Sequence, residues 1–386
     1  MVKKLRSLIC TVVGHVDHGK TTILDQLRGT SVAAKEEGLI TQNISCCELS
    51  LENMKQVCKD IPQFQTIKLP GLLFIDTPGH MAFNNLRKRG GSLADIAILV
   101  IDINEGIKNQ TLESVEILRK NKTPFIIAAN KIDLIPSYQN KYPSILKDIE
   151  SQSETVKEKI QTKLYNIVGK LSEHNLNSDR FDRIEDFTKT IAIVPLSAKH
   201  KKGLAELLLV LCGLAQKFLE KDLNVDISND GKGTILEVKE EKGIGTTLDV
   251  ILYDGTIKKG DIILIAGLNE PIKTKVKGIF QLENKKLKSI DEAEAAAYIK
   301  VITTDIENVI AGMPLIVANE KNTEEKEELI QEEVEEVIIE TDNEGVIIKA
   351  DSLGSLEALI GLLKENDILI KRASIGDINK SDISIA

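Results

Sequence analysis

Residues 14–22 read GHVDHGKTT, and this run limits the possible folds of the chain more than any other stretch. An apolar run at residues 7–13 precedes it, and residues 22–28 have the pattern of a helix. Glycines let a backbone wrap around a phosphate group, and the N-terminus of the following helix attracts the anion. The order of strand, glycine-rich loop and helix therefore predicts a phosphate-binding loop rather than an ordinary turn.

Two side chains of this loop have distinct roles in that interpretation. Lys20 would reach the terminal phosphates, and Thr21 would bind Mg²⁺. The other contacts with a nucleotide are expected from neighbouring residues of the same run. The predicted set is Val16, Asp17, His18, Gly19, Lys20, Thr21 and Thr22.

A second motif follows a buried strand that is predicted at residues 72–75. It reads DTPGH at residues 76–80, at the carboxyl end of the strand, where open α/β sheets bind their ligands. Asp76 can reach the Mg²⁺ shell through water, and the N–H of Gly79 can approach a γ-phosphate. Alone, this motif would be read as a Pro-Gly turn, but beside the first it predicts a sensor of the third phosphate.

Two further strands, at residues 96–102 and 124–129, flank a predicted helix at residues 110–120. This alternation predicts an α/β fold with a doubly wound, mostly parallel sheet. The second of these strands ends in NKID, residues 130–133. An ionised Asp133 can accept hydrogen bonds from guanine that adenine does not offer, while Asn130 braces the base edge and Lys131 packs on the nucleotide. The predicted ligand is therefore GTP or GDP.

Two weaker signals complete the predicted site. Ser197, Ala198 and Lys199 follow an apolar strand, so the N–H of Ala198 can donate to guanine O6. Thr41 lies in a polar loop at residues 36–42, which can order around Mg²⁺ and the γ-phosphate and loosen after hydrolysis. In isolation the tripeptide carries almost no information and Thr41 reads as a solvent-facing residue. Together with the stronger motifs they predict the remaining nucleotide contacts.

Composition excludes several other classes of protein. Of the 386 residues 42% are hydrophobic, which suffices for two or three packed domains. The 59 acidic and 50 basic residues give a net charge of −9, so any RNA contact requires a local basic patch. The five cysteines form no CxxC motif, and no run approaches the ~20 apolar residues of a membrane span. These features predict a soluble, cytoplasmic protein with reduced thiols and no membrane partner.

The motifs GHVDHGKTT, DTPGH and NKID together resemble those of the translational GTPases. Within that group, GLITQ at residues 38–42 and FNNLRKRG at residues 83–90 look like translation initiation factor five-B, the archaeal and eukaryotic counterpart of bacterial initiation factor two. GVIIKADSLGSLEA at residues 345–358 is similar to the start of that family's third domain. The resemblance covers most of the chain.

The resemblance implies catalytic roles for two residues. His80 matches the residue that orients the attacking water, and Lys20 would help to stabilise the charge of the transferring phosphoryl group. Asp17 matches an acidic position linked to a monovalent cation, K⁺ or Na⁺, although Leu39 replaces the glycine usual in the neighbouring GGIT pattern. The implied function is a GTP hydrolase that acts as a ribosome-dependent switch in translation initiation and promotes subunit joining.

The predicted architecture is a P-loop GTPase domain, a β-barrel domain and the start of a third α/β domain. The expected ranges are 1–222, with an insertion at about 141–187, then 223–318, an acidic linker at 319–336, and 337–386. Regular short strands with glycine turns predict the barrel, where Lys273, Lys275 and Lys277 form either a basic stripe for ribosomal RNA or a solvated strand face. A half-built last sheet suggests a fragment of a longer protein.

The resemblance implies a monomer whose partner is the ribosome, through both subunits, while initiator tRNA would bind only to a C-terminal region outside this sequence. Two other functions remain open. An elongation-type GTPase that delivers tRNA is opposed by NLRKR at residues 85–89 and by the third-domain motif. A nucleotide-gated binding module with incidental hydrolysis differs only in turnover, which has to be measured.

Overall fold

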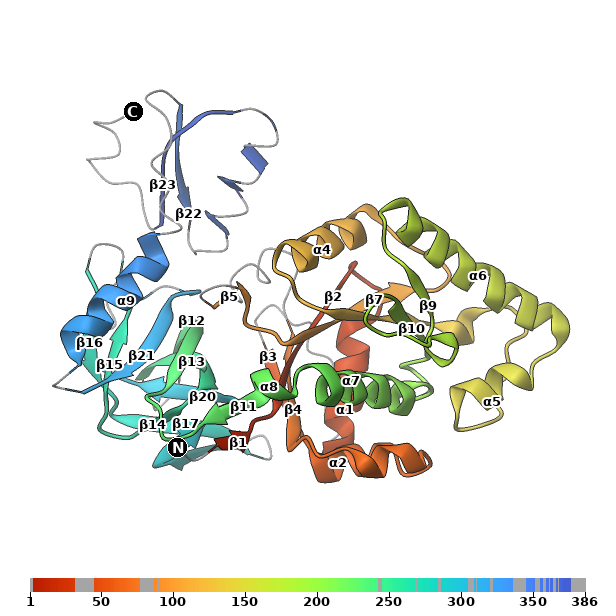
Figure 1. The fold of residues 1–386 in the computed structure, drawn as a ribbon, viewed down its shortest axis with the longest axis horizontal. Coiled ribbons are helices and arrows are strands. Elements are labelled where there is room, and N and C mark those ends of the chain that lie inside the picture. The colour runs from red at the N-terminus through yellow and green to blue at the C-terminus, as the bar shows by residue number, and fades with distance from the viewer. Residues whose placement is uncertain are drawn as a thin grey trace. The chain divides into compact units, whose positions relative to one another are not determined.

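The computed structural model describes residues 3–31, 45–76, 87–88, 91–241, 245–267, 270–283, 286–304, 309, 311–319, 322–335, 345–350, 355–356, 359–360, 362–363, 366 and 368–375 (Figure 1). Contacts between residues divide the chain into two compact units. One comprises Leu5–His80 and Ala94–Asn224, and the other comprises Met1–Lys4, Met81–Leu93 and Val225–Ala386.

A seven-stranded sheet, with strand order β3-β4-β2-β7-β8-β10-β9, forms the centre of the first unit. β3 is antiparallel to β4, and the other neighbouring pairs are parallel. The strands are β2 (Leu8–Gly14), β3 (Ser45–Ser50), β4 (Gly71–Asp76), β7 (Ile96–Asp102), β8 (Phe125–Asn130), β9 (Ser178–Arg180) and β10 (Ile191–Pro195). The predicted α/β fold with a mostly parallel sheet is confirmed.

Helices cover both faces of this sheet, with α1, α2 and α7 on one side and α4 and α6 on the other (Figure 1). Ile96, Ile98 and Val100 of β7 pack in one core with apolar residues of α1 and α7, and the residues between them point to the opposite face. Burial of both faces explains why this strand reads as a continuous apolar run. The helices are α1 (Lys20–Ser31), α2 (Leu51–Val57), α4 (Asn109–Lys120), α5 (Ile145–Glu150), α6 (Glu154–Glu173), α7 (Leu204–Phe218) and α8 (Glu220–Leu223), with 3-10 turns η1 (Pro62–Thr66), η2 (Ile132–Leu134) and η3 (Phe181–Arg183).

The insertion predicted at residues 141–187 is part of this unit. It carries α5, α6 and η3, and its strand β9 pairs in parallel with β10, from Ser178 opposite Ile191 to Arg180 opposite Ile193. One face of α6 is buried, at positions with the spacing of an amphipathic helix: Val156, Ile160, Leu164, Ile167 and Leu171. The segment therefore supplies an edge strand and a helix that packs beside it.

The second unit contains an eight-stranded, curled antiparallel sheet with strand order β16-β15-β21-β12-β13-β20-β17-β18. Its apolar core includes Ile235, Val250, Ile299 and Val301, all fully buried. The β-rich second domain expected from the sequence is confirmed. Its strands are β12 (Lys232–Glu241), β13 (Gly245–Asp254), β15 (Ile262–Ile265), β16 (Ile272–Lys275), β17 (Gly278–Glu283), β18 (Lys286–Ile290), β20 (Ala297–Ile302) and β21 (Pro314–Ala318), beside a paired β14 (Thr256–Lys258) and β19 (Glu292–Glu294).

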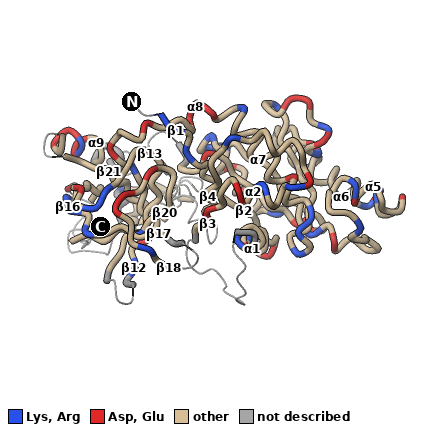
Figure 2. Tube along the Cα trace, turned by 90° about the horizontal axis from the view of Figure 1, so that it is seen from below, with Lys and Arg blue, Asp and Glu red and all other residues tan. Residues whose placement is uncertain are grey.

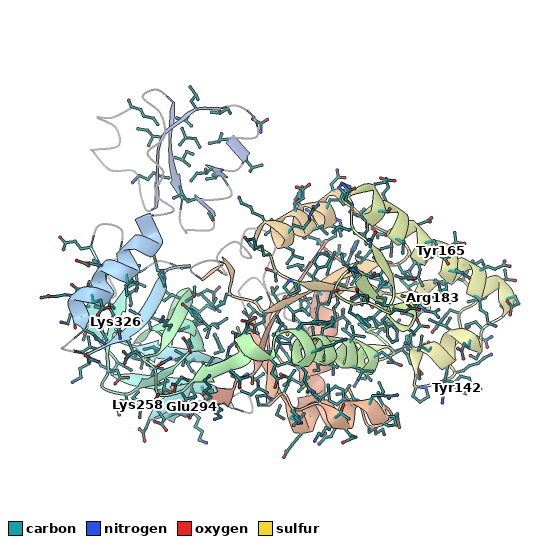
Figure 3. All side chains as sticks on the ribbon, in the orientation of Figure 1. Tyr142, Tyr165, Arg183, Lys258, Glu294 and Lys326 are labelled. Atoms are coloured by element: carbon teal, nitrogen blue, oxygen red, sulfur yellow. The ribbon has the colours of Figure 1, made fainter. Side chains whose placement is uncertain are left out.

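The acidic segment contains helix α9 (Thr323–Glu335), which contacts β15 and β21. Ile330 is buried, and Nζ of Lys326, labelled in Figure 3, donates to the carbonyl oxygen of Val317 at 2.7 Å and pairs with Asp230. Beyond it, β22 (Val346–Ala350) pairs in parallel with β23 (Ile370–Ile375), as a strand-helix-strand pattern requires. The remaining short strands are β1 (Lys3–Leu5), β5 (Arg87–Lys88), β6 (Gly91–Ser92) and β11 (Asn224–Asp226). The domain boundaries stay a prediction.

Acidic and basic residues are interspersed along the chain trace (Figure 2). Lys273 and Lys275 are exposed on β16, on either side of a buried Thr274. A basic stripe for RNA and a solvated strand face both require lysines exposed at alternate positions. The RNA contact therefore stays a prediction. Within the described residues, no helix combines the length and the apolar character needed to cross a bilayer.

Candidate nucleotide-binding site

The phosphate-binding loop leaves the carboxyl end of β2 in a conformation that only glycine tolerates at two positions. Gly14 has φ +141°, and a Cβ there would lie 2.3 Å from the carbonyl oxygen of Val100. Gly19 has φ +95°, and a Cβ there would lie 2.3 Å from Nδ2 of Asn130. The loop is therefore packed directly against β7 and β8, and its curvature depends on both glycines.

Lys20 begins α1 and crosses the loop. Its Nζ donates to the carbonyl oxygens of Gly14 at 2.8 Å and His15 at 2.9 Å. Burial lowers the pKa of Lys20, while the carboxylates of Asp76 and Asp17 raise it. The ammonium is thus fixed beside the first turn of α1, where Thr21 and Thr22 follow.

Neighbouring residues of the loop differ in exposure. Val16 and Asp17 lie at an exposed tip, and Asp17 has φ +64°. The side chain of His18 is buried, with its ring centroid 5.0 Å from that of His15 and its Nε2 3.8 Å from Oε2 of Glu105. Burial lowers the pKa of His18. Because its imidazole points into the protein, the predicted nucleotide contact of His18 is open only to its backbone.

Asp76 ends β4 and has a carboxylate that suits a hydrated cation. The residue is 3% exposed, and among the described residues its Oδ2 has no hydrogen-bond partner. Burial raises the pKa of Asp76, against the charges of Arg28 and Lys20, which lower it. A buried carboxylate oxygen without a partner is costly unless something binds it, and a Mg²⁺-bound water fits this atom.

One buried side chain joins the phosphate loop to the loop at residues 197–199. Asn130, at the end of β8, is 2% exposed; its Nδ2 donates to the carbonyl oxygen of His18 at 3.0 Å, and its Oδ1 accepts from the N–H of Ala198, also at 3.0 Å. The predicted brace of the base edge is thus a brace between two loops. Because the Ala198 N–H already has an acceptor, it can reach guanine O6 only through a shared hydrogen bond.

Sequence reasoning missed the partners of Lys131. This residue has φ +64°, and its Nζ pairs with Oδ2 of Asp102 at 2.9 Å, while Asn104 donates to its carbonyl oxygen at 3.0 Å. Burial would raise the pKa of Asp102, but hydrogen bonds from Lys131 and Asn104 outweigh it and the pKa is lowered. The position of Asp102 at the carboxyl end of β7, like that of Asp76 on β4, is the signal that could have indicated it.

Asp133 lies in η2, with a side chain that is 7% exposed, and Nε2 of His200 is 3.7 Å from its Oδ2. Ser197 and Ala198 are buried, whereas Lys199 is exposed. These residues, the phosphate loop and Asp76 all come from carboxyl ends of neighbouring parallel strands. Thr41, Gly79 and His80 lie outside the described residues, so their predicted contacts stay predictions.

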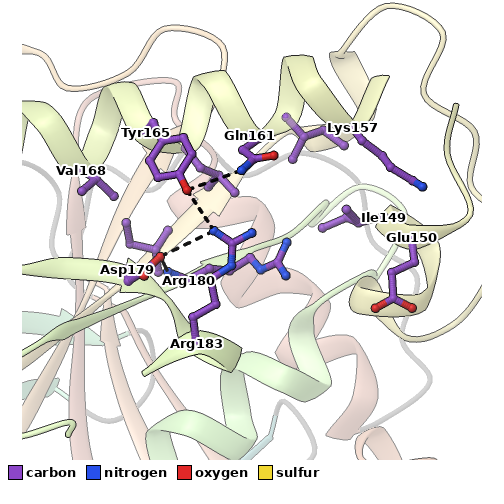
Figure 4. Close-up of a pocket in the computed structure, with 12 residues that line it drawn as sticks. Ile149, Glu150, Lys157, Gln161, Tyr165, Val168, Asp179, Arg180 and Arg183 are labelled. Atoms are coloured by element: carbon purple, nitrogen blue, oxygen red, sulfur yellow. Dashed lines mark hydrogen bonds and ion pairs between the residues drawn. The ribbon is translucent and has the colours of Figure 1, made fainter. Parts of the chain in front are cut away.

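A separate groove, of about 190 Å³, lies between α6 and the segment around β9 (Figure 4). The hydroxyl of Tyr165 accepts from Gln161 at 3.4 Å and Arg183 at 3.5 Å, and Arg183 is 4.0 Å from Asp179. None of the predicted nucleotide-binding residues lines this groove. It is lined by Ile149, Glu150, Lys157, Ile160, Gln161, Leu164, Tyr165, Val168, Asp179, Arg180, Arg183 and Ile193.

The fold and the loops at its strand ends define a P-loop protein of the GTP-binding class, and comparison with known families agrees. Residues 5–217 match the family described as Elongation factor Tu GTP binding domain. Residues 245–316 match Elongation factor Tu domain 2, and residues 318–386 match Translation-initiation factor 2. The chain therefore belongs to the Elongation factor Tu GTP binding domain family.

Within that family, the chain is similar to proteins named "Probable translation initiation factor IF-2". It is 50% identical to the one from Archaeoglobus fulgidus over 390 residues, which are 99% of this chain and 65% of that protein. It is 49% identical to the one from Methanopyrus kandleri over 393 residues, 99% of this chain and 66% of that protein. The chain thus spans just under two thirds of the length of these relatives.

Among solved structures, the chain is similar to the crystal structure of GDP-bound aIF5B from Aeropyrum pernix. The TM-score is 0.88 and the identity 42%, over 99% of this chain and 66% of that one. The resemblance to initiation factor five-B that the motifs indicate is confirmed.

Proposed function

We propose that this chain is a GTP hydrolase that acts as a ribosome-dependent switch in translation initiation and promotes joining of the ribosomal subunits. The observation that carries the proposal is Asn130, which holds the phosphate loop and the loop of Ala198 together beside the buried Asp133. This arrangement suits a ligand with both a guanine base and a phosphate chain. The names of the relatives support the initiation step, the ribosome as partner and the cytoplasm as its place.

The backbone of the phosphate loop and four side chains would hold the GTP phosphates with Mg²⁺. N–H groups of residues 16–22 would face the phosphates, Lys20 would bind their terminal oxygens, and Thr21 and Thr41 would hold the metal, with Asp76 acting through water. Mg²⁺ supplies neutralisation of the charge that develops on the phosphoryl oxygens. The exposed carboxylate of Asp17 is the proposed ligand of a monovalent cation, K⁺ or Na⁺.

His80 is the proposed positioning residue for the attacking water. Gly79, next to it, would contact the γ-phosphate, so the water is oriented only while the third phosphate is present. On the base side, Asp133 would accept hydrogen bonds from guanine, and residues 197–199 would contact its O6 edge. Hydrolysis would remove the γ-phosphate that holds Gly79 and the loop of Thr41. The factor would then leave the ribosome.

A turnover measurement tests this proposal and includes the first prediction. We expect ribosomes to raise GTP turnover by the chain over that in buffer. His80→Ala should keep GTP affinity near that of the wild type and lower ribosome-stimulated turnover at least about tenfold, a modest loss for a water-positioning group. His174→Ala, at the end of α6, is the matched control and should turn over GTP normally. Unchanged turnover in the His80 variant would exclude this role.

The rival functions give different results in the same measurement. A nucleotide-gated binding module would bind GTP and ribosomes without stimulated turnover. An elongation-type GTPase would be stimulated by elongating ribosomes charged with aminoacyl-tRNA rather than by separated subunits. Stimulation that requires both subunits together supports subunit joining.

A further inference from the structure

The segment between NKID and α5, residues 135–144, forms a strap fixed by a buried carboxylate; we call it the guanine strap. Asp148 is fully buried, and its Oδ2 accepts from the hydroxyl of Tyr138 at 2.7 Å. Its Oδ1 accepts from the N–H groups of Lys141 at 2.6 Å and Tyr142 at 2.7 Å. Three donors on one carboxylate satisfy the buried charge and fix the path of the strap.

Of two more buried side chains, Gln152 fastens the strap and Glu206 fastens the start of α5 that follows it. Gln152 accepts from the N–H of Gln139 at 3.0 Å and donates to its carbonyl oxygen at 2.7 Å. Glu206, on α7, accepts from the N–H of Ile145 at 2.9 Å. The guanine strap is therefore attached to α5 and to Gln152, which lies between α5 and α6, while α5 itself is attached to α7 through Glu206.

The strap also reaches the second base-recognition loop. Nζ of Lys202 donates to the carbonyl oxygen of Tyr142, a residue that is 47% exposed and is labelled in Figure 3. The backbone of Lys202 exchanges two hydrogen bonds of 3.0 Å with that of Ser197. These two backbone hydrogen bonds therefore couple the position of Lys202 to the loop of residues 197–199.

On the sheet side, the two base-recognition loops are held independently of this contact. Asn130 bonds to the N–H of Ala198, and the N–H of Ile132 donates to the carbonyl oxygen of Leu196 at 3.2 Å. These bonds belong to the core of the fold. On the side that faces solvent, the hydrogen bond from Lys202 to Tyr142 connects the strap to the loop of residues 197–199.

We propose that Lys202 and Asp148 are positioning residues of the guanine site. They set the separation between the loop that carries Asp133 and the loop that carries Ala198, without touching the base themselves. The inference rests on the proposed function, since it presumes that a guanine nucleotide occupies these loops. It assigns the first helix of the segment at residues 141–187 to nucleotide selectivity.

The test compares three variants of the full chain by binding of fluorescent methylanthraniloyl-GDP. Lys202→Met keeps the aliphatic stem but removes the donor, and we expect it to raise the dissociation constant about fivefold, the effect of one ordinary hydrogen bond at an exposed position. Lys202→Arg keeps a donor and should restore tight binding. Lys201→Met removes the same charge from the adjacent exposed position and should bind like the wild type.

A second readout separates positioning from general loosening of the fold. Inosine diphosphate lacks the exocyclic amine that Asp133 would bind, so the preference for GDP over inosine diphosphate reports the alignment of that carboxylate. We expect the preference to fall at least about twofold in Lys202→Met while the melting temperature stays within about 2 °C, as for an exposed contact. Asp148→Asn should show the same loss of preference, with a lower melting temperature.

The outcomes distinguish this inference from the proposed function. If the wild-type chain does not bind methylanthraniloyl-GDP, the proposed function fails. If it binds, and Lys202→Met matches Lys201→Met in both affinity and base preference, the positioning role is overturned whatever Asp148→Asn does. Weaker binding of methylanthraniloyl-GDP in Lys202→Met, together with tight binding in Lys202→Arg, supports the positioning role.

Discussion

Asn130→Ala should lower the affinity of the chain for GDP by about two orders of magnitude. The change removes the donor to His18 and the acceptor for Ala198, two buried bonds of 3.0 Å. Each loss leaves a buried backbone group without a partner, at a cost of about 1–3 kcal/mol. The free energy of unfolding should fall by about 2–6 kcal/mol, because both bonds are internal to the fold. Titration with methylanthraniloyl-GDP and chemical denaturation measure the two effects.

Asn121→Ala is the matched control for that substitution. Asn121 is also buried, 9% exposed, at the end of α4, and among the described residues its Nδ2 has no hydrogen-bond partner. Asn130→Asp keeps an acceptor for Ala198 but turns a carboxylate oxygen toward the carbonyl oxygen of His18, so it should weaken GDP binding at least as much as Asn130→Ala. Unchanged GDP affinity in Asn130→Ala would show that the phosphate loop and the loop of residues 197–199 hold their positions without this brace.

The parts of the fold that sequence predicted well depend on local patterns. The apolar run at β7 and the glycine-rich loop before α1 each carry their signal within about ten residues, so periodicity and loop chemistry suffice. The left-handed conformation at Gly19 explains the requirement for glycine there, but the nearby Asn130 side chain that also excludes a Cβ comes from a strand more than a hundred residues away.

The parts that sequence could not supply depend on contacts between distant segments. β9 has three residues, Ser-Asp-Arg, with no apolar alternation, and it is a strand only because β10 pairs with it. Lys131 was expected to pack on the nucleotide, and nothing near it in sequence indicates its ion pair with Asp102. Burial of the His18 ring is likewise set by its surroundings, since a histidine in a polar loop reads as exposed.

The same distinction applies to Ala198. Its position after an apolar strand predicts an N–H at the base edge, and that contact stays a prediction. The identity of its acceptor is a tertiary property, because Oδ1 of Asn130 arrives from β8. Motifs can therefore predict where a site lies, whereas the hydrogen bonds within it depend on the tertiary structure.

Asp133→Asn should reverse the base preference of the chain. An ionised Asp133 accepts hydrogen bonds from the N1–H and the amine of guanine, and loss of two charge-assisted bonds lowers affinity by about three orders of magnitude. The amide of asparagine instead donates to the carbonyl oxygen that xanthine carries in place of the amine. We expect xanthosine diphosphate to bind more tightly than GDP, measured by competition against methylanthraniloyl-GDP in the wild type and methylanthraniloyl-XDP in the variant.

The low exposure of this carboxylate, 7%, is the reason to expect so large an effect, since water cannot easily replace the lost partners. Asp186→Asn makes the same chemical change at an exposed carboxylate whose hydroxyl and backbone donors come from Thr188, and it should leave base preference unaltered. If Asp133→Asn still preferred GDP over xanthosine diphosphate, Asp133 would not be the residue that reads the base, and the site would have to recognise guanine through its O6 edge alone.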